Sequence, residues 1–318
     1  MRADRVFRDL LLCAALAASA LAVPLLITLF PGPLHHLLHS YDDLAQACAA
    51  ALYRLGVELP ALGALVLAIA GVTAVAGVIA FVRISVRTSA SLRARRVVPV
   101  PPALALAAAR VGISTRVSCI AEGRPLAYCA GLIRPRVWIS TGAAAALGRD
   151  ELEAVLLHEA YHLRHRDPLR VFISLVLQRM FFGFPMVSAL GARFAVAKEL
   201  DADRSVLEVQ QSPAALAGAL SVLGRSIHSF PSHGVALGAW SLSTARVDQL
   251  CGTPDEFLLP RVPAGSRVVS AFVLALLLLL AGGQAARANL LPAGVVEAII
   301  ATSTEIHECP LPAEAILF

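Results

Sequence analysis

The sequence contains little charge, few aromatic residues, few cysteines and almost no lysine. Charged residues make up 15% and aromatic residues 6% of the 318 residues, whereas apolar residues make up 58%. This balance, with a mean hydropathy of +0.73, lies outside the range of soluble domains and predicts a protein embedded in the lipid bilayer. The six cysteines are too sparse for a disulfide scaffold, and no Cys-x-x-Cys pair indicates a zinc knuckle.

Arginine supplies nearly all of the basic charge, because Lys198 is the only lysine in the chain. Most of the arginines that produce the net charge of +5 lie beside long apolar runs. Basic residues in that position mark the cytoplasmic flank of a membrane span. Direct binding to nucleic acid is therefore not expected.

Three apolar runs are long enough to cross a membrane, at about residues 10–30, 61–82 and 268–286. A helix needs about 20 apolar residues to span roughly 30 Å of hydrocarbon. A cleaved signal peptide is the alternative for the first run, because arginines precede it and "ASA" at 18–20 resembles a cleavage site. The apolar run continues well past that point, which favours a membrane helix.

The arginines also predict the topology. They precede the first span at Arg2, Arg5 and Arg8, and they follow the second at Arg83, Arg87, Arg93, Arg95 and Arg96. Both flanks are therefore expected in the cytoplasm of a multi-pass plasma-membrane protein. We predict two spans with an external loop in 1–96, a cytoplasmic domain in 97–266, and a third span with an extracytoplasmic tail in 267–318.

This topology separates the cysteines by compartment. Cys48 in the first loop and Cys309 in the tail would face the oxidising side, so they could form a disulfide. Two unpaired thiols remain the alternative.

Residues 97–266 show the pattern of an α+β domain. A helix-like apolar stretch at 102–113 is followed by short β-branched runs between 116 and 141, which predict a small antiparallel sheet. A helix with Asp150 and Glu151 near its start comes next. The fold class expected is a mainly α membrane protein with three transmembrane helices and a small α+β domain.

That helix carries the stretch "VLLHEAYHLRHRD", in which His158 and His162 stand four residues apart. Residues at this spacing share one helix face, so both imidazoles can bind one Zn²⁺. Glu159 lies beside them and can take a proton from a metal-activated water. The layout is that of a metallopeptidase.

A catalytic zinc requires a third protein ligand. In "AKELDADRSV", Glu199 and Asp203 share a helix face, so Glu199 is predicted to bind the metal and Asp203 to orient a histidine. A solvated acidic patch is the alternative, and His165 competes with Glu199. If Glu199 is a ligand, the apolar stretch at 168–192 cannot cross the membrane once, because it would separate Glu199 from His158.

Three blocks of sequence resemble those of membrane gluzincin peptidases, above all the family of beta-lactam-sensing receptor (BlaR/MecR-like) metallopeptidases. They are "AYCAGLIRPRVWIST", "ELEAVLLHEAYHLRHRD" and "KELDADRSVL". The HtpX-type and CAAX-prenyl protease family shares these blocks and is a close second.

The resemblance implies a cytoplasmic, minigluzincin-like endopeptidase. Its zinc ligands would be His158, His162 and Glu199, with Glu159 catalytic and Asp203 supporting. A protein or peptide substrate, such as a transcriptional repressor in a signalling pathway, would lie along an edge strand at 126–131. A buried hairpin is the alternative for that run.

One departure from the receptors is expected. Their sensor domain uses a serine in an SxxK motif, but Ala195 stands three residues before the only lysine, Lys198. We therefore expect no penicillin-binding sensor, so that any input would come from a small loop, the membrane or a partner.

The sequence offers three candidates for the residue that stabilises the oxyanion. Arg246 in "TARVDQL" is the preferred candidate because this block also resembles the family, with His228 and His233 as alternatives. The alternative functions are an HtpX-like quality-control protease or a non-catalytic zinc-binding scaffold in membrane signalling. An intact Glu159 argues against the scaffold, since a structural metal site needs no general base.

Overall fold

The computed structural model describes residues 2–29, 59–227, 243–253 and 258–290. The chain divides into two compact units, residues 1–18 with 71–273 and residues 19–70 with 274–318. Four residues named in the sequence predictions, Cys48, His228, His233 and Cys309, lie outside the described part of the chain.

Within the described residues, three helices are long and apolar enough to cross a membrane: α1 (Arg2–Leu29), α4 (Leu59–Arg93) and α13 (Ala264–Leu290). They lie at the three predicted spans, so the prediction of three apolar helices long enough to cross a membrane is confirmed. Large apolar side chains on them are exposed, such as Leu16 at 63% and Phe272 at 69%, as expected for contact with lipid.

The helices α1 and α4 are longer than the predicted spans. α1 begins at Arg2, and α4 continues through part of the basic flank to Arg93. Each added residue gains a backbone hydrogen bond and arginine is a good helix former, so nothing ends the helix where the apolar run ends.

The sheet has four short strands: β1 (Val97–Val98), β2 (Val117–Ile120), β3 (Ala127–Ala130) and β4 (Arg136–Ser140). Their order is β1-β2-β4-β3. β4 is antiparallel to β3 but parallel to β2, with Cys119 opposite Ile139. The sheet is therefore mixed, and the prediction of an antiparallel sheet was wrong.

The connections explain the mixed sheet. After β2 the chain passes to the outer position and forms β3, and a tight turn then brings β4 back between β2 and β3. Gly131 opens this turn at a φ of 114°, where a Cβ atom would stand 2.8 Å from the Arg134 carbonyl oxygen. A run of β-branched residues indicates a strand but not which strand it pairs with.

The run predicted as an edge strand corresponds to β3, which lies at one end of the strand order. The side chains of Ala127, Tyr128, Cys129 and Ala130 are all buried. β3 thus has features of both alternatives. It is at the edge of the sheet, as an edge strand is, and its side chains are buried, as in a buried hairpin.

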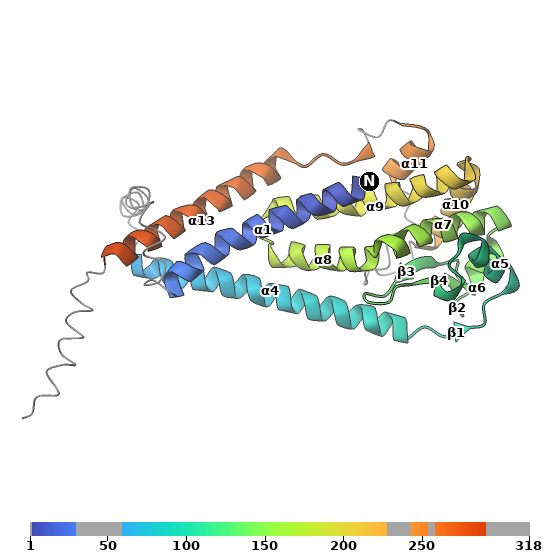
Figure 1. Ribbon diagram of the computed structural model, residues 1–318, viewed down its shortest axis with the longest axis horizontal. Helices are drawn as coiled ribbons and strands as arrows, with labels where there is room; N and C mark the ends of the chain where they lie inside the picture. Colours follow the sequence, from blue (N-terminus) through green and yellow to red (C-terminus); the bar gives the residue numbers. More distant parts are fainter. Residues whose placement is uncertain (1, 30–58, 228–242, 254–257, 291–318) are drawn as a thin grey trace, which may run out of the picture. The chain divides into compact units, whose positions relative to one another are not determined.

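The main core lies between one face of the sheet and several helices, chiefly α5 (Pro102–Val111), α6 (Thr141–Ala146), α7 (Arg149–His165) and α10 (Ala214–Ile227). Val137, Ile139 and Val155 are fully buried there. On the other face, Tyr128 and Trp138 pack with Leu92 near the end of α4. The sheet is thus covered on both faces, and α7 lies across its core face (Figure 1).

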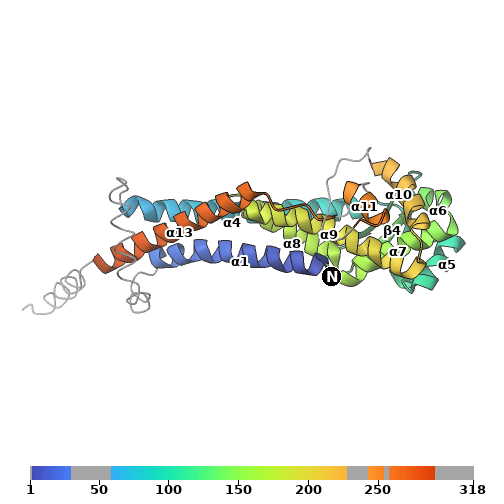
Figure 2. The ribbon, with the colours of Figure 1, turned by 90° about the horizontal axis from the view of Figure 1, so that it is seen from above.

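The stretch at 168–192 folds as parts of two helices, α8 (Asp167–Met180) and α9 (Pro185–Gln210). The chain turns at 181–184, and α8 and α9 lie side by side in Figure 1 and in the perpendicular view of Figure 2. Neither is among the candidate membrane spans of the described residues. The hairpin returns α9 to α7, and α11 (Thr244–Leu250) packs against α9.

The first turn of α6 allows a stability test. A Cβ atom at Gly142 would lie 2.1 Å from the Gly123 carbonyl oxygen, whereas nothing lies within 4 Å of a Cβ atom at Gly123. We predict that Gly142→Ala lowers the free energy of unfolding by about 1–3 kcal/mol, because backbone must move. Thermal unfolding in detergent measures this, with Gly123→Ala as the matched control. Equal melting temperatures for the two variants would contradict the prediction.

Candidate metal centre

The helix α7 buries the two motif histidines and the glutamate between them. His158 and Glu159 are fully buried, and His162 is 3% exposed. The Glu151 carboxylate accepts a hydrogen bond from the Gly148 backbone N–H at the start of α7, which fixes that end of the helix.

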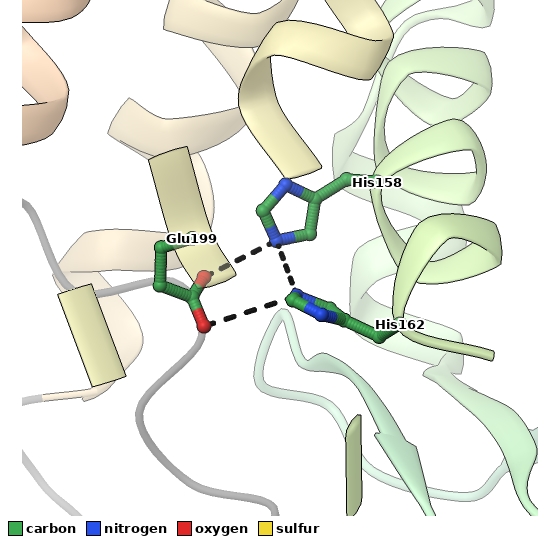
Figure 3. A group of neighbouring side chains, drawn as sticks. All are labelled: His158, His162 and Glu199. Atoms are coloured by element: carbon green, nitrogen blue, oxygen red, sulfur yellow. Dashed lines mark hydrogen bonds and ion pairs between the residues drawn. The ribbon is translucent and has the colours of Figure 1, made fainter. Parts of the chain in front are cut away.

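The helix α9 brings Glu199 to these histidines. The Nε2 atoms of His158 and His162 lie 3.1 Å apart, and the Glu199 carboxylate lies 3.3 Å from the first and 3.8 Å from the second. Figure 3 shows the three side chains pointing toward one another from the two helices. The described residues contain this one buried group of three metal-binding side chains.

Carboxylates hold the outer nitrogens of both imidazoles. His158 Nδ1 lies 2.9 Å from Asp203 Oδ1, and His162 Nδ1 lies 2.7 Å from Asp167 Oδ2. When each Nδ1 carries a proton for its carboxylate, each Nε2 presents a lone pair to the centre.

This donor set suits a metal cation. Two nitrogen lone pairs 3.1 Å apart beside a carboxylate repel one another unless a cation lies among them. Two imidazoles and one carboxylate, each imidazole oriented by a further carboxylate, form the ligand pattern of catalytic zinc sites. His158, His162 and Glu199 are the residues that would hold the metal.

Arg246 reaches the site from α11 and binds Asp203. Its Nε and Nη2 atoms donate to the two Asp203 oxygens at 2.6 and 2.5 Å, and its Nη1 lies 3.7 Å from Glu199. Arg246 is 1% exposed and Asp203 is fully buried. Gln249, also on α11, donates to the Leu200 carbonyl oxygen at 2.9 Å, which holds α11 against α9.

Lys198 is the second cation at the centre. Its ammonium group donates to the Glu199 carboxylate, and its side chain is 14% exposed. The only lysine of the chain therefore lies beside a predicted metal ligand.

The ionisation of these groups follows from their pairing. Burial disfavours the Glu199 carboxylate, but Lys198 and His162 outweigh it and hold the pKa of Glu199 well below its usual range. Burial likewise opposes the charge of Asp203, yet Arg246 lowers the pKa of Asp203. Burial alone would lower the pKa of His162, whereas Glu199 and Asp167 raise it to about 9. Without metal, the cluster therefore keeps ionised carboxylates and attracts a proton to His162.

Two residues near the ligands in the sequence lie away from the centre. The His165 ring stacks on Tyr161 at 4.1 Å and its Nδ1 lies 2.9 Å from the Tyr161 carbonyl oxygen, so it does not join the metal group. Asp201 accepts a hydrogen bond from the Ala3 backbone N–H at 2.9 Å.

Sequence analysis missed Asp167, which orients His162. The chain reaches it through Arg166, a left-handed residue with a φ of 52° that ends α7 and begins the turn into α8. The available signal was an acidic residue directly before Pro168 at the start of a helix, a common pattern that does not by itself indicate a metal site.

Comparison with known families identifies the family of the chain. A family model described as BlaR1 peptidase M56 matches residues 39–220, which is more than half of the chain. The chain belongs to the BlaR1 peptidase M56 family. This peptidase is therefore a membrane-associated metallopeptidase, and the resemblance stated from its sequence blocks is confirmed. No solved structure matches the chain.

We predict that this M56 peptidase binds about one metal ion and that His158→Ala, His162→Ala and Glu199→Ala each weaken binding at least a hundredfold. Loss of an orienting residue alone costs roughly 10–100-fold in such sites. Metal content per protein after dialysis measures the effect.

His165→Ala and Glu208→Ala are the matched controls, since His165 faces away from the centre and Glu208 is exposed on α9. Full metal content in Glu199→Ala, together with loss in His165→Ala, would show that His165 is the third ligand.

Proposed function

We propose that the protein is a zinc-dependent endopeptidase that cleaves proteins or peptides at the cytoplasmic face of the plasma membrane. The observation that carries the proposal is the buried convergence of His158, His162 and Glu199, with Glu159 on the same helix. Zinc is favoured over other divalent ions because two imidazoles and one carboxylate with an open position form its usual catalytic set.

Each residue has a distinct role in this reaction. When bound, the zinc acts as a Lewis acid that activates water and polarises the scissile carbonyl. Glu159 accepts the proton of the attacking water and delivers it to the leaving amine. Its fully buried position keeps that proton from bulk solvent.

The surrounding pairs hold the ligands in place. Asp203 and Asp167 each fix one imidazole with Nε2 toward the metal, and Arg246 holds Asp203 through two hydrogen bonds. Arg246 donates to Asp203 through Nε and Nη2, which supports a positioning role for it. Its predicted role at the oxyanion would depend on Nη1, which lies 3.7 Å from Glu199.

Substrate binding by strand addition is supported by the place of β3. This strand borders the sheet and contacts α7, the helix that carries Glu159. An extended peptide paired with β3 would gain backbone hydrogen bonds close to α7. Such binding suits the minigluzincin-like arrangement expected from the sequence.

The contact between α1 and α9 supports the proposal that the amino terminus and the active site lie on the same side of the membrane. The Ala3 backbone N–H donates a hydrogen bond to Asp201, two residues beyond Glu199, so the amino-terminal end of α1 lies beside α9. The arginines at this end and after α4 favour the cytoplasm for both.

The biological role proposed is regulated proteolysis in signalling, with a repressor as one possible class of substrate. Quality-control proteolysis of the HtpX type and a non-catalytic scaffold are the alternatives. The buried Glu159 beside the metal ligands favours catalysis over the scaffold.

We predict that Glu159→Gln retains the metal and lowers cleavage about 10²–10⁴-fold, because the general base is lost while the ligands remain. Quantification of new protein amino termini in cells expressing each form measures this and also identifies substrates. Glu153→Gln, on the same helix and paired with Arg110, is the matched control. Cleavage that persists in Glu159→Gln would exclude this mechanism.

A topology test is independent of catalysis. Reporter fusions at about residues 45, 150 and 310 should report outside, inside and outside the cytoplasm, because the arginine flanks orient the spans. An outside signal at residue 150 would overturn the cytoplasmic assignment.

A further inference from the structure

Two adjoining cavities lie beside the amino-terminal half of α1, and the metallopeptidase site uses neither of them. One is an apolar groove of about 830 Å³ and the other a polar pocket of about 300 Å³. Arg2 and Arg5 line both, so the two cavities meet at these arginines. Both volumes are in the range of roughly 300–1,000 Å³ typical of ligand sites.

The polar pocket is built from basic and hydroxyl side chains. Arg2, Arg5 and Arg204 line it together with Tyr161 and Ser205, and the carboxylates in its wall are Asp201 and Glu208. Tyr161 is 2% exposed. Guanidinium groups gathered in one pocket are suited to the oxygens of a phosphate.

The groove continues from these arginines along the apolar surface of α1. Leu12 and Leu16 line it from α1, and Leu190 and Val262 line it from across the groove. Eleven residues of helix separate Arg5 from Leu16, a rise of about 17 Å. The groove therefore runs along α1, with arginines at one end and apolar side chains along its length.

The charges of the two cavities favour an anion. Four arginines (Arg2, Arg5, Arg193 and Arg204) face three carboxylates (Asp9, Asp201 and Glu208). Two of these carboxylates already have basic neighbours, because Asp201 lies 3.4 Å from Arg2 and Asp9 lies 4.0 Å from Arg8, which does not line either cavity.

The groove also distinguishes between classes of ligand. Leu12 and Leu16 belong to a helix apolar enough to lie in hydrocarbon, where the backbone of a bound peptide would lack water to satisfy its polar groups. An acyl chain has no such groups. A soluble phosphate would fill the polar pocket and leave the groove empty.

We infer that these cavities form a binding site for one anionic phospholipid. Its phosphate lies beside Arg5 and Arg204, and an acyl chain lies along Leu12 and Leu16. The pocket reaches the metal helices, because Tyr161 precedes His162 and Asp201 follows Glu199 by two residues. The lipid would therefore bridge α9 and the amino-terminal end of α1, two elements that lie side by side (Figure 1). They already meet through the hydrogen bond from the Ala3 backbone N–H to Asp201.

Native mass spectrometry of the full-length protein in detergent tests the inference without relying on peptidase activity. The probes are phosphatidylglycerol, phosphatidylcholine with the same acyl chains, and glycerol phosphate. Phosphatidylglycerol should bind the unaltered protein more tightly than either of the others. Arg5→Ala with Arg204→Ala should weaken it about tenfold or more, since each basic residue near an anionic headgroup contributes to binding.

Matched controls separate the site from general charge and general apolarity. Arg149→Ala with Arg225→Ala removes the same charge from exposed residues outside both cavities and should leave binding unchanged. Leu12→Trp, which fills the groove, should weaken phosphatidylglycerol binding, whereas Leu11→Trp on the neighbouring surface should not.

Three results would overturn the inference. They are equal binding of phosphatidylglycerol and phosphatidylcholine, equal binding of glycerol phosphate and phosphatidylglycerol, and unchanged binding in the Arg5 and Arg204 variant. If that variant fails to fold, Leu12→Trp decides the outcome because it keeps every charge. Loss of lipid binding would leave the metal content intact, which distinguishes failure of this inference from failure of the proposed function.

Discussion

The burial of a set of charged groups that require compensating partners is the constraint on which the peptidase depends. His158, Glu159 and Asp203 are fully buried, and Glu199 is 7% exposed. Ionised groups are stable in such surroundings only when partners or a metal replace the lost water. Arg246 on Asp203 and Lys198 on Glu199 supply part of that compensation, and the donor set at the centre suits a cation that supplies the rest.

This constraint explains why helices distant in the sequence must meet. The hairpin of α8 and α9 returns Glu199 to α7, and the turn at Arg166 directs Asp167 back to His162. α11 contributes the cation that holds Asp203. The sheet contributes no metal ligand, but it fixes the core face on which α7 lies and presents β3 at its edge.

The first membrane helix is also part of the peptidase. Ala3 and Val6 pack against Phe194 and Ala197 on α9, and Arg170 of α8 pairs with Asp4 at 2.7 Å. The amino-terminal end of α1 is therefore in direct contact with the helix that carries Glu199. The inferred lipid would bind at this junction, and it would therefore contact both the first membrane helix and α9, the helix that carries Glu199.

The sequence by itself determined the features that depend on local spacing or local composition. Apolar length predicts three membrane helices, and the spacing of four places His158 beside His162 and Glu199 beside Asp203 on their helices. Only the tertiary structure decided which elements meet: β4 beside β2, Asp167 on His162, Arg246 on Asp203 and α1 on α9. Those contacts depend on turns and on packing between distant segments, which neither helix periodicity nor hydropathy predicts.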